Sequence, residues 1–179
     1  TIIDGDTFQD NNLNRQLGCT ERTLGRPKAE CMVERAREVN GAVRVTAHVA
    51  WLTEENGVSL LSGADVVVDA LDNLPTRFVL ERLAAKLDRP MVHGAIGGYM
   101  GQVMTVYPGD PGLRAFYGTP TIERGIETQL GNPAATPMMV AAWQIQAVVR
   151  ILSGQGELLR NRILIMDAEH GDVAEIHLS

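Results

Sequence analysis

Two acidic residues follow a short apolar run at the beginning of the chain. Ile2 and Ile3 predict a β-strand, and Asp4 and Asp6 come directly after it. Nucleotide-binding α/β domains place a carboxylate against ribose hydroxyl groups at such a position. Because acids at strand ends also cap loops, the pattern by itself leaves Asp4 open as either a ribose ligand or a loop residue.

Two cationic segments come next along the chain. Arg15 lies beside the amides Asn12 and Gln16, and Lys28 stands at the start of an expected helix in the segment Gly25-Arg26-Pro27-Lys28. A helix N-terminus has unpaired N–H groups and the positive end of the helix dipole, so cations there suit a polyphosphate. The alternative, a solvated helix start, stays open on these residues alone.

A third acidic position follows the apolar run Ala64–Ala70. Asp72 lies at the expected carboxyl end of this strand, where open α/β sheets bind their ligands. Mg²⁺ needs one or two protein carboxylates when substrate phosphates supply the other ligands. Asp72 is therefore a candidate magnesium ligand, although an aspartate before a helix is also a common turn residue.

Strand and helix patterns alternate over the first hundred residues, which is typical of a parallel sheet with helices on its faces. Beyond Gly97-Gly98, short segments between glycines and prolines predict antiparallel strands. The predicted fold is α/β, with a Rossmann-like, mostly parallel sheet, helices on both faces and antiparallel C-terminal strands, in a single domain over residues 1–179. We expect strands at 1–4, 43–49, 64–70, 91–93, 102–107, 162–166 and 173–178, helices at 27–40, 75–87 and 138–152, and a loop at 109–136.

The composition argues against several classes of partner. The net charge is −6 with both signs well mixed, so we expect no nucleic-acid partner, because binding a phosphate backbone requires a basic stripe. The apolar run around Met138–Val149 is interrupted by glutamines and is expected to be too short to cross a membrane. Cys19 and Cys31 match neither a redox pair nor a zinc half-site, which favours structural roles and a cytoplasmic location. The four histidines are expected to be structural or exposed, and Trp51 is expected to be a packing residue.

The candidate motifs occur in an order that resembles the ThiF/MoeB/HesA family of adenylyltransferases. The resemblance rests on Asp4-x-Asp6, Asn12-Leu13-x-Arg15-Gln16, Gly25-Arg26-Pro27-Lys28 and Asp72-Asn73-x-Pro-Thr-Arg77. It continues through His93-Gly94-Ala95-Ile96 and Gly101-Gln102-Val103 into the helix Pro137–Gly154, and so covers nearly the whole chain.

The resemblance implies a role for each of these positions. Asp4 contacts the ribose of ATP, Arg15 and Lys28 hold the phosphates, Asp72 binds Mg²⁺, and Asn12 and Gln16 support them. The implied reaction is attack by the C-terminal Gly-Gly carboxylate of a ubiquitin-like sulfur-carrier protein (ThiS- or MoaD-like) on the α-phosphorus of ATP. The implied assembly is a homodimer that pairs through the apolar helix 138–152.

The sequence departs from the family pattern in three places. The glycine-rich loop expected about 20 residues before the ribose acid is not in this sequence, so we expect an N-terminally incomplete domain whose first strand and loop lie elsewhere or are lost. The segment Pro111–Tyr117 lacks the CxxC pair of many relatives, so zinc is not expected. The loop 109–136 has no cysteine, so we expect it to grip the carrier's tail rather than to carry a thioester, with Arg114, Thr119, Thr121, Arg124 and Thr128 as contacts.

Two other functions remain to be weighed against adenylylation. A non-catalytic carrier-binding module that has lost its ATP chemistry would account for the missing glycine loop. A nicotinamide-dependent oxidoreductase would share the α/β sheet, but it leaves the Asn12–Gln16 and Asp72–Arg77 motifs unexplained.

Overall fold

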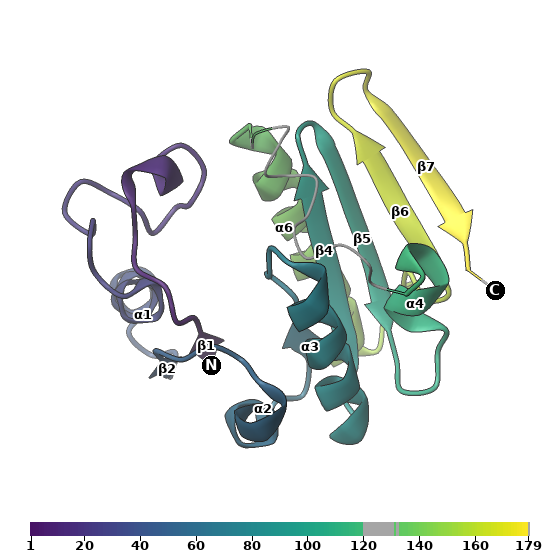
Figure 1. The fold of residues 1–179 in the computed structure, drawn as a ribbon, viewed down its shortest axis with the longest axis horizontal. Helices are drawn as coiled ribbons and strands as arrows, with labels where there is room; N and C mark the ends of the chain where they lie inside the picture. The colour runs from purple at the N-terminus through teal and green to yellow at the C-terminus, as the bar shows by residue number, and fades with distance from the viewer. Residues whose placement is uncertain (120–130, 132, 179) are drawn as a thin grey trace. The chain divides into compact units, whose positions relative to one another are not determined.

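The computed structural model describes residues 1–119, 131 and 133–178 (Figure 1). These residues divide into two compact units, Thr1–Leu60 and Leu61–Ser179. Each unit is described by itself, and the single-domain organisation expected over residues 1–179 stays a prediction.

The first unit is built around one helix and two short parallel strands. β1 (Ile2–Ile3) pairs in parallel with β2 (Ala47–His48), and α1 (Lys28–Val39) contacts both strands. The helix begins after Pro27, as expected for a residue that lacks an N–H donor, and ends at the extended Asn40. The strand predicted at 43–49 is limited to Ala47–His48, and the unit also contains the 3₁₀ turn η1 (Asp10–Asn12) and most of α2 (Glu54–Leu61).

A small apolar cluster holds the first unit together. Phe8, Cys19 and Cys31 are buried in it, and Leu24 and Met32 pack against them. Both cysteines are free thiols. Both cysteines therefore pack in the apolar cluster, and the absence of a chemical role for them stays a prediction.

The second unit contains a five-stranded sheet with the order β3-β4-β5-β6-β7. The strands are β3 (Val67–Val68), β4 (Met91–Gly97), β5 (Met100–Val106), β6 (Arg162–Asp167) and β7 (Asp172–His177). β3 and β4 are parallel, and the remaining neighbours are antiparallel. Tight turns connect β4 to β5 and β6 to β7, whereas α4 (Gly112–Tyr117) and α6 (Ala135–Ser153) lie between β5 and β6. The predicted α/β class and the antiparallel C-terminal strands are confirmed, and the parallel pairs among the described residues are β1–β2 and β3–β4.

The strand predicted at 64–70 is much shorter than its apolar run. Only Val67–Val68 pair with β4, and the side chain of Val68 is 46% exposed. The predicted bounds 64–70 were therefore too wide, because an apolar run does not show how far the neighbouring strand pairs with it.

Helices cover both faces of this sheet (Figure 1). Gly94 and Gly101 face α6 (Ala135–Ser153), whereas His93 faces Tyr117 of α4 (Gly112–Tyr117) on the opposite side. α4 lies inside the stretch predicted as a loop at 109–136, so that prediction was wrong for residues 112–117. The helix forms because the Glu81 carboxylate accepts a hydrogen bond from the Leu113 N–H at 2.7 Å, a long-range contact that local sequence does not reveal.

α6 is longer than its apolar run predicted. Among the described residues it is the one helix long and apolar enough to cross a membrane, so the expectation that this run is too short was wrong. Its buried face contains the polar side chains of Thr136 and Gln144 and packs on β4 and β5. Five residues form the core between this helix and the sheet: Val103, Val140, Leu159, Leu164 and Met166.

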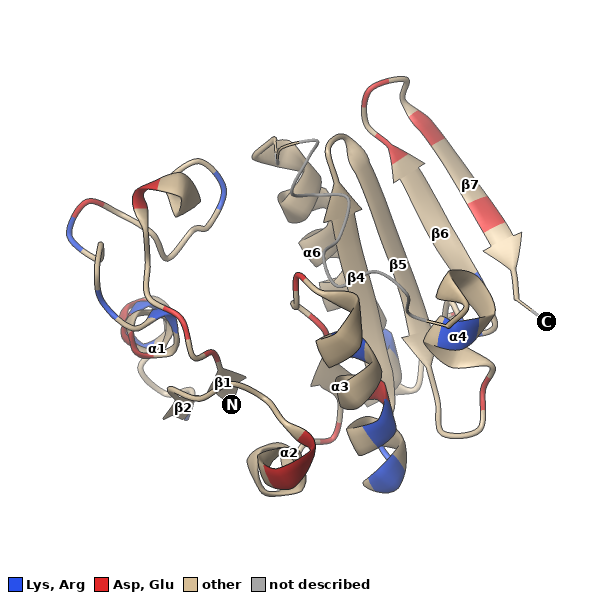
Figure 2. Cartoon of the chain, viewed as in Figure 1, with Lys and Arg blue, Asp and Glu red and all other residues tan. Residues whose placement is uncertain are grey.

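Among the described residues, the charged side chains form no basic stripe. Figure 2 shows acidic and basic residues side by side on α1, while β4 and β5 contain no charged residue. The charges of the second unit therefore lie on its helices, loops and outer strands.

Candidate functional site

The predicted ribose acid lies at the carboxyl end of β1, in a tight turn. Asp4 continues the pairing beyond β1, because its N–H donates to the His48 carbonyl at 3.1 Å. Its Oδ1 accepts a hydrogen bond from the Asp6 N–H at 2.9 Å. The turn thus orders both acids at the edge where open α/β sheets bind ligands.

Lys28, the predicted phosphate ligand at the start of α1, is paired with the second of these acids. Its Nζ lies 2.6 Å from Asp6 Oδ2, and its side chain is 13% exposed. The hydrogen bond from Lys28 is the main reason why the pKa of Asp6 is lowered. The pair fixes the ammonium group at the N-terminus of α1, while its contact with a phosphate stays a prediction.

Three further predicted residues lie in the segment between β1 and α1. Arg15 Nη1 donates to the Asn11 carbonyl at 2.7 Å, which holds the guanidinium against the turn. Asn12 is buried and its Nδ2 donates to Asn11 Oδ1 at 3.0 Å, so it helps to shape this turn, while its role in supporting an ATP site stays a prediction. Gln16 continues the turn through its N–H, which donates to the Asn12 carbonyl at 3.0 Å.

Trp51 occupies a place that the sequence did not indicate. Its indole ring lies against Gly5, where an added Cβ would come within 2.7–2.9 Å of the ring carbons. Glycine is therefore needed between Asp4 and Asp6 for this approach. The ring thus packs on Gly5, as expected of a packing residue, although Trp51 as a whole is 67% exposed.

In the second unit, Asp72 lies in the loop after β3, as predicted. The residue is exposed, and its Oδ1 accepts a hydrogen bond from Asn73 Nδ2 at 3.2 Å. Asn73 in turn caps α3 (Leu74–Lys86), because its Oδ1 accepts from the Thr76 N–H at 3.0 Å. An exposed carboxylate on a loop fixed at its helical end fits Mg²⁺, which takes oxygen ligands and retains several waters.

A buried ionic cluster lies directly beneath this loop. Asp69 is fully buried, and its Oδ2 lies 2.6 Å from His93 Nδ1 and 3.6 Å from Arg77 Nε. Its Oδ1 accepts a hydrogen bond from the Leu71 N–H at 2.9 Å. Burial lowers the pKa of His93 despite the adjacent carboxylate, so the imidazole is neutral and the charge pair is Asp69 with Arg77.

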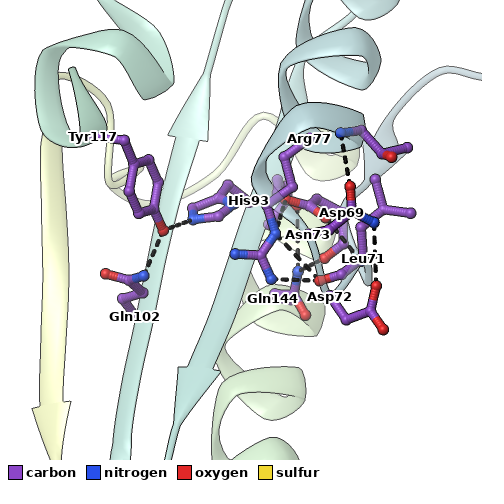
Figure 3. A network of polar contacts seen from close by, with 11 residues as sticks. Asp69, Leu71, Asp72, Asn73, Arg77, His93, Gln102, Tyr117 and Gln144 are labelled. Atoms are coloured by element: carbon purple, nitrogen blue, oxygen red, sulfur yellow. Dashed lines mark hydrogen bonds and ion pairs between the residues drawn. The ribbon is translucent and has the colours of Figure 1, made fainter. Parts of the chain in front are cut away.

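The cluster continues to α4 through the Tyr117 hydroxyl group (Figure 3). Tyr117 Oη lies 2.9 Å from His93 Nε2, and Gln102 Nε2 of β5 donates to the same oxygen. The two rings meet edge to face, with centroids 5.7 Å apart. Residues from β4, β5, α3 and α4 therefore converge under the Asp72 loop.

Gln144 joins the cluster from the opposite face of the sheet. Its Nε2 donates to the Asp69 carbonyl at 2.7 Å and to the Val92 carbonyl at 3.3 Å. Gly94 makes room for it, because a Cβ there would come within 2.5 Å of the amide group. The glutamine thus pairs with the Asp69 carbonyl and is a second donor to the Val92 carbonyl, which also accepts from the Asp69 N–H at 2.9 Å.

The sequence missed most of this cluster. Asp69 is hidden in an apolar run, and His93 was expected to be structural or exposed without an identified partner. The signal that could have found it was the position of Asp69 and His93, each within an apolar strand. A polar residue at such a position is expected to be buried, and buried polar residues have partners.

In the part of the chain that the structure describes, no group of three possible metal ligands includes a cysteine. Cys19 and Cys31 lie in the apolar cluster of the first unit, and burial raises the pKa of the Cys31 thiol. In the described residues one group of possible ligand atoms lies close together, at the exposed turn Asp167, Glu169 and His170. The expectation of no bound zinc stays a prediction.

The carrier-gripping role predicted for the loop falls largely outside the described residues. Thr121, Arg124 and Thr128 lie within 120–130, of which nothing is described. Arg114 is exposed on α4, and Thr119 is exposed two residues after that helix.

Comparison with known proteins identifies relatives over nearly the whole chain. An adenylyltransferase and sulfurtransferase MOCS3-2 of Zea mays is 34% identical over 171 residues, which cover 93% of this chain and 35% of that protein. A sulfur carrier protein adenylyltransferase of Thermus thermophilus is 31% identical over 175 residues, which cover 93% of this chain and 65% of that protein. The chain therefore spans between about one third and two thirds of these relatives.

The fold has close counterparts among solved structures. The crystal structure of E. coli MccB with ATP superposes with a TM-score of 0.84 at 16% sequence identity, over 99% of this chain and 56% of that chain. The model of the ThiF family matches residues 1–179, and the chain belongs to that family.

Proposed function

We propose that the protein adenylylates the C-terminal Gly-Gly carboxylate of a ubiquitin-like sulfur-carrier protein at the expense of ATP. The observation that carries the proposal is the exposed Asp72 carboxylate, held at the carboxyl end of β3 by a fully formed buried cluster. A relative named as a sulfur carrier protein adenylyltransferase supports the same substrate class.

The predicted site residues have separate roles in this reaction. Asp4 would bind ribose hydroxyl groups, and Arg15 and Lys28 would hold phosphates, with Asn12 and Gln16 shaping the turn around Arg15. The carrier's carboxylate attacks the α-phosphorus, an O–P bond forms, and the bond to pyrophosphate breaks. The cations stabilise the negative charge that develops on the phosphate oxygens.

Asp72 is the residue that would hold Mg²⁺. When bound, the ion supplies charge neutralisation of the phosphates and orients them. No protein nucleophile is required, since the carrier's own carboxylate forms the new bond. This fits the free cysteines of the first unit, which are buried.

The proposal is tested by carrier-dependent exchange of labelled pyrophosphate into ATP, using the full-length protein and a carrier that ends in Gly-Gly. Asp72→Asn should lower the exchange by about 100-fold or more, because it removes a ligand that acts on transition-state charge. Asp65→Asn, at the exposed opposite end of β3, is the matched control and should retain exchange. Near-full exchange by Asp72→Asn would sink the assignment. A wild-type protein that binds the carrier without exchange would instead be the non-catalytic module.

We also propose that the protein is a homodimer that pairs through α6. Ile145, Val149 and Leu152 are exposed on this helix, and monomeric soluble proteins rarely expose large contiguous apolar patches. Ile145→Glu should shift the full-length protein to monomers in sedimentation experiments. Gln146→Glu adds the same charge at the neighbouring exposed position and should not. A wild-type monomer at micromolar concentration would decide against pairing.

A cytoplasmic location completes the proposal. It is supported by the two free thiols, which a reducing compartment maintains. Recovery of the protein in a periplasmic or secreted fraction would contradict it.

A further inference from the structure

The Tyr117 hydroxyl group contacts one of the supports of the Asp72 loop. It lies 2.9 Å from His93 Nε2 and accepts a hydrogen bond from Gln102. These two partners come from β4 and β5, while Tyr117 itself is the last residue of α4. A single hydroxyl group therefore connects three elements of the second unit.

The hydrogen bonds of this cluster have one consistent direction. The Asp69 carboxylate accepts a hydrogen bond from the Leu71 N–H and faces the Arg77 guanidinium. Because a carboxylate has no proton to donate, it also accepts a hydrogen bond from His93, whose Nδ1 then carries the proton. The neutral imidazole then has a lone pair on Nε2, to which the Tyr117 hydroxyl donates. The amide of Gln102 donates to the tyrosine oxygen, so each group in this series of hydrogen bonds from Gln102 to Asp69 has a partner.

Both arms end on the peptide groups of Leu71, the residue before Asp72. The arm through His93 ends at Asp69 Oδ1, which accepts from the Leu71 N–H at 2.9 Å. The arm through Arg77 ends at the Leu71 carbonyl, which accepts from Nε at 3.2 Å and also from Nη2. Leu71 is thus held at its N–H by Asp69 and at its carbonyl by Arg77. Asp69 bonds to His93, the partner of Tyr117, and Arg77 lies 3.6 Å from Asp69.

We propose that Tyr117 is a positioning residue for the metal-binding loop, because its hydroxyl orients the His93–Asp69 arm that holds the backbone next to Asp72. The inference rests on the proposed function of Asp72 and adds to it a residue 45 positions further along the chain. Tyr117 itself touches neither ATP nor carrier in this role. Loss of its hydroxyl group would loosen the loop and so weaken the binding of Mg²⁺.

The test is Tyr117→Phe in the full-length protein, with Tyr107→Phe as the matched control. Tyr107 loses the same atom at the end of β5, where its ring lies under the Arg160 guanidinium outside this cluster. Direct titration of Mn²⁺ by electron paramagnetic resonance, with a non-hydrolysable ATP analogue present, measures metal binding without turnover. Tyr117→Phe should weaken Mn²⁺ binding about 3- to 10-fold, the effect of one net hydrogen bond, and Tyr107→Phe should leave it unchanged.

A second measurement separates positioning from a general structural role. In pyrophosphate exchange, Tyr117→Phe should raise the apparent Mg²⁺ constant by the same factor, and high Mg²⁺ should restore the wild-type rate. The Km for the carrier should not change. A lower rate at all Mg²⁺ concentrations with unchanged metal binding would show that the hydroxyl group only stabilises α4, and would overturn the inference.

His93→Asn provides an independent variant in case Tyr117→Phe does not fold. Its amide can still donate to Asp69 but cannot accept from Tyr117, so it should weaken Mn²⁺ binding by a similar factor. The double variant should be no weaker than the weaker single variant, because both interrupt one arm. Multiplicative effects would overturn the inference. If Asp72→Asn binds Mn²⁺ like the wild type, the proposed function of Asp72 fails instead, and the two failures are distinguished.

Discussion

Asp69→Asn tests whether the buried negative charge of Asp69 stabilises the buried positive charge of Arg77 beneath the Asp72 loop. Asp69 is fully buried and Arg77 is 5% exposed, and their closest charged atoms lie 3.6 Å apart. Asparagine is nearly isosteric and its Oδ1 can still accept from the Leu71 N–H. The substitution therefore removes the negative charge while it leaves the shape of the site intact.

The expected cost follows from the charge that remains. Breaking a buried ion pair by removal of one partner costs about 3–5 kcal/mol, because the other charge is left buried and uncompensated. The neutral His93 cannot replace the lost anion. This cost is a large part of the about 5–15 kcal/mol that separates folded and unfolded states of a typical domain.

Hydrogen exchange in the full-length protein measures the loss of stability at individual backbone amides. Amide protection over residues 66–73 and 91–97 should fall about 100-fold or more in Asp69→Asn, since each 1.4 kcal/mol corresponds to about a factor of ten. Asp65→Asn, at the exposed end of the same strand, should change protection little. The double variant Asp69→Asn/Arg77→Met removes both charges and should recover part of the loss. A cost below about 1 kcal/mol for the single variant, or simple additivity in the double variant, would refute the reasoning.

Two further predictions concern stability. Because burial lowers the folded-state pKa of His93, the unfolded chain binds its proton more readily, so stability should fall as the pH drops below about 6.5, by at most about 1.4 kcal/mol per pH unit. Thermal unfolding from pH 7.5 to 5.0 should show this component, and His93→Asn should remove it; an unchanged slope in the variant would exclude His93 as its source. Gly112→Ala should cost about 2–4 kcal/mol, because its Cβ would lie 1.9 Å from Glu81 Oε1 and displace the cap of α4, in addition to the strain of a positive φ. Gly109→Ala has the positive φ without a neighbour within 4 Å and should cost about 1–2 kcal/mol, and equal melting temperatures for the two variants would contradict the clash.

The sequence predicted well the elements whose bounds are set by residues close to one another in sequence. α1 and α3 lie within a residue or two of their predicted bounds, since helical spacing, Pro27 and the cap Asn73 act within a few residues of each other. The antiparallel pairs β4–β5 and β6–β7 were also predicted, because turn residues join strands that are adjacent in sequence. The same locality placed Asp4 and Asp72 at strand ends.

Contacts between distant residues decided the rest. β3 is two residues long because its extent depends on β4, and α4 forms because Glu81, about thirty residues earlier, caps it. The partners of Asp69 are His93, 24 residues away, and Gln144, 75 residues away. No local pattern specifies such pairs, since each requires the sheet to bring separate segments together. The sequence by itself therefore determined the family motifs and which strand ends carry the acids, while the tertiary structure determined which buried groups hold those acids in place.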